Sequence, residues 1–280
     1  MIRWASLRRL LVPLVFFAAA AFALAFLVLP LVALLTHEPP GRLTGQLSNP
    51  VVTDALVISL ETSAIAQAAV LLAGTPLAYL LARRFRGRSV LVTLVELPIV
   101  LPPAVAGIGL IVAFGRLGLL GGTFAALGID VLLNRAAVVL AVAFVSGPLY
   151  VRTAIAAFEA VDERLVGASR TLGAGPVRTF LRVVLPLASG GLAAGAALAL
   201  ARGLGEFGAT IMFAGSLQGV TQTLPLAIYY EFDANLDVAL TISALFVIMT
   251  AAVLLSLKLT GLWHASRSRS SIRSATSASS

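Results

Sequence analysis

Six segments of this chain are long and apolar enough to cross a lipid bilayer. A membrane-spanning helix needs about 20 mostly apolar residues. Of the 280 residues, 59% are hydrophobic and only 11% are charged, whereas charged residues make up about 25% of a typical soluble domain. We therefore predict an all-α membrane protein with about six transmembrane helices in contact with the lipid bilayer. The predicted spans are 10–35, 55–82, 89–114, 136–151, 185–213 and 238–257.

The composition excludes several classes of function. The chain has no cysteine, so it has no disulfide framework, thiolate metal site or thiol nucleophile. Its two histidines, His37 and His264, are far apart in the sequence, and we expect no metal site. The net charge of +8 is compatible with nucleic-acid binding. However, the arginines lie between apolar segments, where a role as topology signals explains them better, and we expect no nucleic-acid partner.

The distribution of Lys and Arg predicts the orientation of the helices, because cytoplasmic loops are enriched in these residues. With the N-terminus inside, 16 of the 20 basic residues fall on the cytoplasmic side, three fall outside and Arg202 lies within a span. Both termini and the loops near residues 86 and 167 are therefore predicted to face the cytoplasm. The inner residues are Arg3, Arg8, Arg9, Arg83, Arg84, Arg86, Arg88, Arg152, Arg164, Arg170, Arg178, Arg182, Lys258, Arg267, Arg269 and Arg273, and the outer ones are Arg42, Arg116 and Arg135.

The two ends of the chain lie outside the predicted core. Residues 1–52 form an extra N-terminal transmembrane helix and an outer loop, residues 53–262 form the core, and residues 263–280 form a tail rich in Ser and Arg. Ala21-Phe22-Ala23 resembles a signal-peptidase site, but the apolar run continues for twelve residues beyond it, which favours a retained helix over a cleaved signal. We expect the cytoplasmic tail to be disordered. Binding to anionic lipid headgroups is the alternative to a solvated topology signal.

A polar loop between the fourth and fifth spans carries the strongest functional signal. Leu165, Ala168 and Leu172 have helical spacing and form a narrow apolar stripe. Gly173 suits the position just after a helix, and Pro176 suits the first turn of the next one. The loop, residues 159–182, is thus predicted to hold a short helix parallel to the membrane. From this pattern alone, a helix lying on lipid headgroups is as good an interpretation as a docking surface.

The same loop resembles the EAA loop of ABC importer permeases. The family pattern is Glu-Ala-Ala, three residues, Gly, nine residues and Ile-x-Leu-Pro, and here Gly167-Ala168-Ser169 stands in place of Glu-Ala-Ala. Gly173 matches the Gly, and Leu185 and Pro186 match the Leu-Pro. The leading Glu is absent, although Glu163 lies one helical turn earlier. The resemblance implies that the following residues couple this chain to an ATPase: Glu163, Leu165, Gly167, Ala168, Ser169, Arg170, Leu172, Gly173, Leu185 and Pro186.

Further stretches are similar to the molybdate branch of the molybdate/sulfate permeases. They are residues 94–103, 170–175, 201–210 and 223–229, and the resemblance covers roughly residues 53–260. It implies the architecture of a type I ABC importer permease in the bacterial cytoplasmic membrane. The implied partners are a second copy of the chain, a cytoplasmic ATP-binding subunit dimer and an extracytoplasmic oxyanion-binding protein. ATP and Mg would be bound by the partner subunit, with no cofactor in this chain.

Charged and proline-rich positions inside the spans predict the transport pathway. Arg202 and Glu206 have the spacing of a pair on one helical face, and intramembrane charges tend to face the bundle or a watery path. Pro98, Pro102 and Pro103 interrupt the third span, and broken helices in membranes lie against protein or water. A permanent structural ion pair and a merely kinked packing helix are the alternatives. The predicted pathway and gating residues are Arg202, Glu206, Phe207, Gly208, Pro98, Pro102 and Pro103.

Two isolated acids, Glu61 and Glu96, also lie within predicted spans. A proton relay normally uses a chain of acids, so structural hydrogen bonding is the favoured interpretation of each. Direct anion binding by Arg202 is less favoured, because an importer that receives cargo from a binding protein needs weak internal affinity.

Rival functions find little support in the sequence. A P-loop needs Gly-x-x-x-x-Gly-Lys-Ser/Thr, and the only lysine, Lys258, follows no glycine-rich loop, so we expect a transport subunit without catalytic residues. The chain contains neither His-Glu-x-x-His nor Gly-x-Ser-x-Gly, motifs that would favour an intramembrane enzyme. An ion-coupled transporter would be expected to have two broken helices, and the sequence predicts one. Sulfate, thiosulfate and tungstate remain alternatives to molybdate as cargo.

Overall fold

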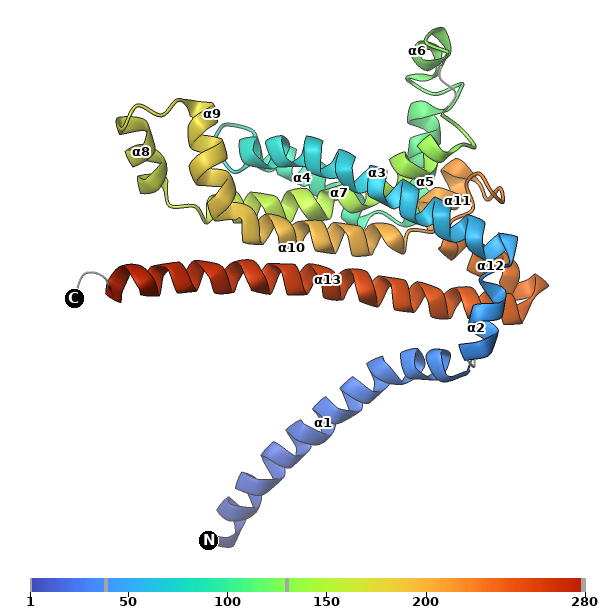
Figure 1. The fold of residues 1–280 in the computed structure, drawn as a ribbon, viewed down its shortest axis with the longest axis horizontal. Coiled ribbons are helices and arrows are strands. Elements are labelled where there is room, and N and C mark those ends of the chain that lie inside the picture. The colour runs from blue at the N-terminus through green and yellow to red at the C-terminus, as the bar shows by residue number, and fades with distance from the viewer. Residues whose placement is uncertain (1, 38–39, 129–130, 278–280) are drawn as a thin grey trace.

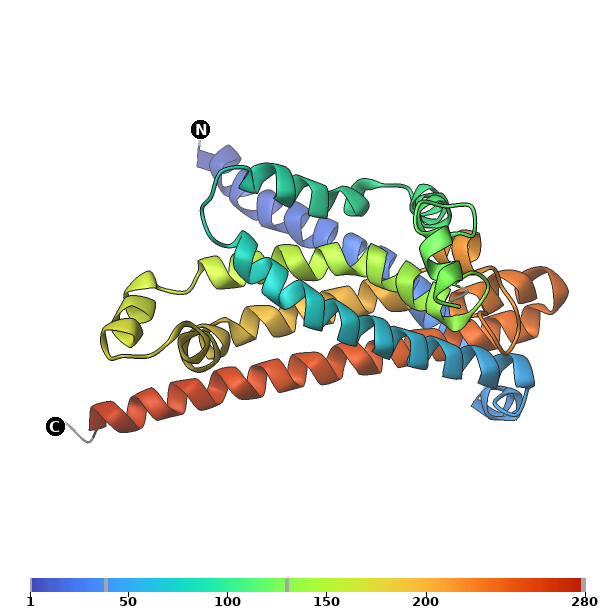
Figure 2. The ribbon, with the colours of Figure 1, turned by 90° about the horizontal axis from the view of Figure 1, so that it is seen from above.

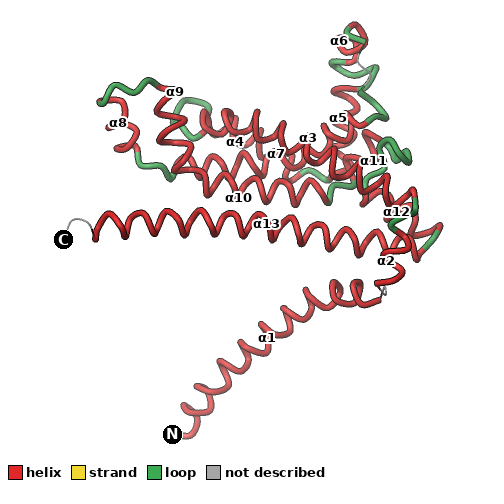
Figure 3. Tube along the Cα trace, viewed as in Figure 1, coloured by secondary structure: helices red, strands yellow, loops and turns green. Residues whose placement is uncertain are grey.

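The computed structural model describes residues 2–37, 40–128 and 131–277. Within these residues the chain is helical and contains no strand, as Figure 3 shows. The helices are α1 (Ile2–His37), α2 (Pro40–Gln46), α3 (Pro50–Leu81), α4 (Arg88–Val100), α5 (Pro103–Phe114), α6 (Gly121–Ala126), α7 (Arg135–Glu159), α8 (Glu163–Thr171), α9 (Pro176–Thr179), the π-helical turn η1 (Phe180–Val184), α10 (Leu185–Leu204), α11 (Gly208–Ala214), α12 (Leu224–Ala234) and α13 (Leu236–Ser277).

The long helices α3, α7, α10 and α13 run roughly side by side, whereas α1 runs obliquely away from them (Figures 1 and 2). Five helices in the described residues are long and apolar enough to span a membrane, and the bent pair α4 and α5 makes up to six. The start of α1, the start of α4, α8 and the end of α13 lie toward one end of the bundle, whereas α2, α6 and α12 lie toward the other (Figure 1). The prediction of an all-α membrane protein with about six spans is therefore confirmed.

Helix α7 forms the centre of the bundle and packs mainly against α3 and α10. The contacts rely on small residues: a Cβ added to Gly74 would lie 2.9 Å from a ring carbon of Tyr150, and one added to Gly191 would lie 2.5 Å from Ala157 Cβ. Buried Tyr150 completes the contact through its hydroxyl, which lies 2.6 Å from Thr75 Oγ1. Small residues suit this role because membrane helices associate through close packing rather than through a hydrophobic force.

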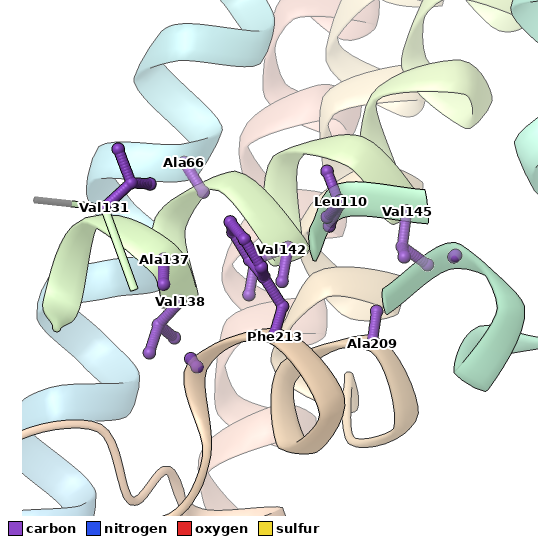
Figure 4. Packing of buried hydrophobic residues seen from close by; sticks show 12 residues of the cluster. Ala66, Leu110, Val131, Ala137, Val138, Val142, Val145, Ala209 and Phe213 are labelled. Carbon is purple, nitrogen blue, oxygen red and sulfur yellow. The ribbon is translucent and has the colours of Figure 1, made fainter. Parts of the chain in front are cut away.

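A second buried cluster joins four helices near the opposite end of α7 (Figure 4). Ala66 of α3, Leu110 of α5 and Val142 of α7 contribute to it, and Phe213 of α11 is 1% exposed within it. This cluster anchors the two short helices α5 and α11 on the long helices, which matters because both belong to the predicted pathway.

The third and fifth spans differ from the prediction, and the fifth starts earlier, in the span Pro176–Leu204. The third divides into α4 and α5, whose axes are bent by 117°. The fifth, expected to run through 185–213, ends at Leu204, and α11 starts separately at Gly208. The bent pair α4 and α5 is the one broken span found in the described residues, as expected. The interruption between α10 and α11, which the apolar run of residues concealed, was not predicted.

The ends of the chain also differ in part from expectation. Helix α1 is continuous through the signal-peptidase-like motif, and its side chains from Pro13 to His37 are not buried. Helix α13 continues to Ser277, whereas the sequence predicts disorder from residue 263. The segment after the last span contains no proline, so no residue there forces the helix to stop. The predicted boundaries at residues 52 and 262 fall inside α3 and α13.

Candidate functional site

Local signals in the sequence define both ends of α8, as predicted for the coupling loop. Asp162 is the N-cap, and its Oδ1 accepts a hydrogen bond of 2.8 Å from the backbone N–H of Arg164. Glu163 follows in the first turn, where a carboxylate interacts favourably with the helix dipole. Gly173 lies just beyond the helix with φ +83°, a conformation in which a side chain is strained. Pro176 begins α9, as expected.

The predicted apolar stripe of α8 points away from the rest of the chain. Leu165 is 48% exposed and Leu172 is 88% exposed, and Ala168 is exposed as well. The opposite side holds the helix in place: Val166 packs against the core, and Ser169 Oγ lies 3.1 Å from the hydroxyl of buried Thr179 in α9. The stripe is thus an apolar surface that this chain presents without covering it. Gly167 and Arg170 lie on the same short helix.

The last part of the predicted motif, Leu185-Pro186, follows a π-helical turn. The N–H of Leu185 bonds to the carbonyl of Phe180 rather than to that of Leu181. A proline inside a helix has no N–H to donate and collides with the carbonyl four residues earlier. The wider turn accommodates Pro186 and lets α9 continue into α10. The motif therefore fixes the connection between α8 and a long helix of the bundle.

The first helix break lies at Leu101, between α4 and α5. Leu101 adopts an extended conformation with ψ 137°, as expected for a residue that precedes a proline. Pro102 is the N-cap of α5 and Pro103 is in its first turn. Pro98 lies inside α4 and does not end it. Two of the three predicted prolines therefore make the break.

The second break places Glu206 outside the helix in which it was predicted. Helix α10 ends at Leu204, yet Arg202 Nη1 still lies 2.8 Å from Glu206 Oε2. Glu206 Oε1 accepts a hydrogen bond of 2.8 Å from Ala209 N at the start of α11. The Glu206 side chain is 1% exposed, and that of Arg202 is 35% exposed. The pair is therefore real, but the carboxylate also caps the helix that follows the break.

The two breaks meet in the structure. A Cβ added to Gly208 of α11 would lie 2.6 Å from Pro103 Cβ of α5, and one added to Gly107 would lie 2.6 Å from Met212 Cβ. A cavity of about 30 Å³ lies beside this contact, lined among others by Pro98, Pro103 and Arg202. That volume suffices for about one water molecule. The prolines of the first break and the ion pair at the second were predicted separately, but in the structure they lie together. We call this contact between α5 and α11, with Pro103, Gly208 and Glu206, the helix-break joint.

Aromatic residues of α12 extend the joint and were not predicted. The ring of Phe207 lies 5.2 Å from that of Tyr229, which lies 5.7 Å from that of Tyr230. Both tyrosines are exposed. The start of α12 is fixed by Ser59 of α3, whose Oγ accepts a hydrogen bond of 2.7 Å from Leu224 N. The stretch 223–229, similar to the molybdate branch, marked this segment, but nothing in it indicated its neighbours.

The two acids that the sequence leaves isolated both have partners. Glu61 Oε2 lies 2.5 Å from Arg135 Nη1, and Glu96 Oε1 lies 3.4 Å from Arg152 Nε. Each pair joins different helices and remains partly exposed. Each of the two acids thus forms an ion pair between helices, rather than a hydrogen bond to a neutral group. In the described residues, no cluster of three or more His, Cys, Asp and Glu side chains is arranged to hold a metal ion.

Comparison with known proteins identifies the family. Residues 71–269 match the family described as binding-protein-dependent transport system inner membrane component. The chain belongs to this family. It is 44% identical to the molybdenum transport system permease protein ModB of Mycobacterium bovis over 245 residues, which cover 84% of this chain and 90% of that protein. It is also 35% identical to the probable transport system permease protein NifC of Clostridium pasteurianum, over 92% of this chain and 90% of that protein.

The fold agrees with the family. The chain superposes on a chain of a bacterial ABC transporter involved in the import of the polysaccharide alginate with a TM-score of 0.71, covering 93% of this chain and 98% of that one. The two are only 14% identical, so the likeness concerns the fold alone. Together with the family match, this likeness shows that the chain is a multi-pass ABC importer permease, as the sequence predicted.

Proposed function

We propose that this chain is the membrane permease subunit of an importer that passes molybdate across the bacterial cytoplasmic membrane. The observation that carries the proposal is the identity of 44% with a molybdenum transport permease over 84% of this chain. The predicted orientation, with both termini and α8 in the cytoplasm, belongs to the same proposal. It is supported by the location of the arginine-rich loops at one end of the bundle (Figure 1).

The motor would be a separate ATP-binding subunit that docks on α8. An uncovered apolar stripe on a short, polar helix suits a protein partner, because Leu172 and Leu165 are exposed at a site outside the spanning segments. The hydrogen bond between Ser169 and Thr179 and the connection through Pro186 would transmit a push on α8 to α10. The ATP and Mg belong to that subunit, and this chain carries out no catalysis.

The pathway would open and close at the joint between the two helix breaks. Helix α11 is short and is held by Glu206 at its start and by close contacts with α5. A movement of α10 would act on α11 through Arg202 and Glu206, which lie on either side of the second break. A second copy of the chain would supply the other half of the pathway, and an extracytoplasmic binding protein would deliver the oxyanion.

The cargo is tested by competition in proteoliposomes. The chain is reconstituted with its ATPase subunit and binding protein, and uptake of labelled molybdate is measured against an excess of sulfate, thiosulfate or tungstate. We expect sulfate and thiosulfate to have no effect on ATP-dependent uptake, and competition by tungstate would add it to the cargo. Uptake that sulfate abolishes would instead assign the chain to the sulfate branch.

A further inference from the structure

A cavity in the described part of the chain lies behind α8, far from the helix breaks. It has a volume of about 790 Å³ and is bounded by the end of α3, the start of α4, the end of α7 and α8. Tyr79 and Phe158 form an aromatic wall, with ring centroids 5.4 Å apart. The cavity therefore lies at the boundary between the bundle and the coupling loop.

The lining of this cavity carries an excess of positive charge. Four arginines and two glutamates give the lining a net charge of +2. Arg88 forms an ion pair with Glu159 and donates a hydrogen bond of 2.6 Å to the carbonyl of Leu81. In the part of the chain that the structure describes, no ion pair is found for the other arginines or for Glu163. The three remaining arginines are Arg83, Arg84 and Arg170.

These three arginines are exposed and come from two separate elements that both line the cavity. Arg83 and Arg84 belong to the α3–α4 loop, whereas Arg170 belongs to α8. Arg83 is already held in place: its Nη2 donates a hydrogen bond of 2.8 Å to Tyr79 Oη, and its guanidinium lies 4.7 Å from the centre of that ring. A guanidinium forms strong, often bidentate hydrogen bonds with a carboxylate or a phosphate. The cavity supplies such donors from two elements.

Gly167 leaves open space in a lining whose two glutamates, Glu159 and Glu163, do not balance its four arginines. The residue lines the cavity, and a Cβ added to it would have no atom within 4 Å. It occupies the position of the leading Glu in the family pattern. A glutamate at this point would begin in open space beside the cavity, and no atom of the described chain fills that space.

We propose that the cavity behind α8 binds a phosphate-type oxyanion, which balances the excess of arginines in the lining and ties α8 to the α3–α4 loop. The source is an anionic phospholipid headgroup or a free anion from the cytosol, since basic pockets at the cytoplasmic ends of membrane helices bind anionic headgroups. The site is distinct from the helix-break joint, so the inference goes beyond the proposed function and does not depend on the identity of the cargo.

The test measures the thermal stability of the full chain in nanodiscs. One arm uses phosphatidylcholine discs titrated with inorganic phosphate against chloride at the same ionic strength. The other arm uses discs that contain phosphatidylglycerol, measured first without phosphate and then with the same phosphate titration. A ligand that binds the folded protein raises the melting temperature in a saturable way. A rise with phosphate in the first arm identifies a free anion, whereas a rise with phosphatidylglycerol that suppresses the phosphate response identifies a headgroup.

Two variants at one position test the role of charge. Gly167→Glu supplies an internal carboxylate and is expected to weaken the response at least roughly tenfold in apparent affinity. The matched variant Gly167→Gln has the same size without the charge and is expected to respond like the wild type. Absence of a response in both arms, or an equal loss in both variants, would overturn the proposal. A response that disappears when the ATPase subunit is added would also overturn it, because a side chain of that partner would then fill the cavity.

Discussion

The contact between α5 and α11 can be tested with two glycines on the same helix. Gly107 and Gly109 both lie inside α5. A Cβ added to Gly107 would lie 2.6 Å from Met212 Cβ and 2.9 Å from the carbonyl oxygen of Ala209, whereas one added to Gly109 would have no atom within 4 Å. The same substitution by alanine therefore has opposite consequences at positions two residues apart.

The expected difference follows from two terms. Alanine is more favourable than glycine in a helix interior by about 0.5–1 kcal/mol, and this gain is common to both variants. At Gly107 the new methyl group must displace α11, and overpacking of this kind costs about 1–3 kcal/mol. Gly107→Ala should therefore be less stable than Gly109→Ala by about 1–3 kcal/mol, which corresponds to a melting temperature lower by about 2–12 °C for a chain of this size.

The assay is thermal unfolding of both purified variants in the same detergent, followed by the loss of the monodisperse peak in size-exclusion chromatography. The wild type provides the reference. Equal melting temperatures for the two variants would refute the reasoning, because they would mean that α11 does not lie against α5 at Gly107.

Two further predictions concern the ion pair and the coupling helix. Glu206→Gln keeps the acceptor for the start of α11 but loses the charge, and hydrogen bonds to charged groups are worth about 1.5–3 kcal/mol. We expect normal expression and assembly of this variant, with uptake reduced roughly tenfold or more. The control Glu61→Gln alters a partly exposed pair, and its uptake should stay near that of the wild type. Normal uptake by the Glu206 variant would count against a role in coupling. Leu172→Glu should abolish co-purification of the ATPase subunit, whereas Leu119→Glu, 86% exposed in the loop before α6, should not; retention in both would exclude α8 as the docking surface.

The features predicted correctly are those determined by neighbouring residues. The end of α8 follows from Gly173 and the start of α9 from Pro176, each of which acts on its own turn of the chain. The break before α5 follows from two consecutive prolines, since the residue before a proline avoids the helical conformation. The long apolar runs predicted the spans for the same reason, because length and hydropathy suffice to identify a membrane helix.

The features that were missed depend on contacts between distant segments. The break after Leu204 lies in an apolar, glycine-containing run with no proline, and Glu206 becomes a cap only because α11 packs against α5. The partner of Glu61 is 74 residues away in the sequence, so the pair appears only once α3 and α7 are in contact. The stripe on α8 was found, but its outward direction depends on the contact of Ser169 with Thr179.

The central claim is that this chain moves an oxyanion only when a separate ATPase drives it. The most direct measurement is the uptake of labelled molybdate by proteoliposomes that contain the chain alone, the chain with the ATPase subunit, or both together with the binding protein. We predict uptake only in the complete assembly and only with hydrolysable ATP. Uptake by the chain alone, or uptake in the complete assembly without ATP, would contradict the account.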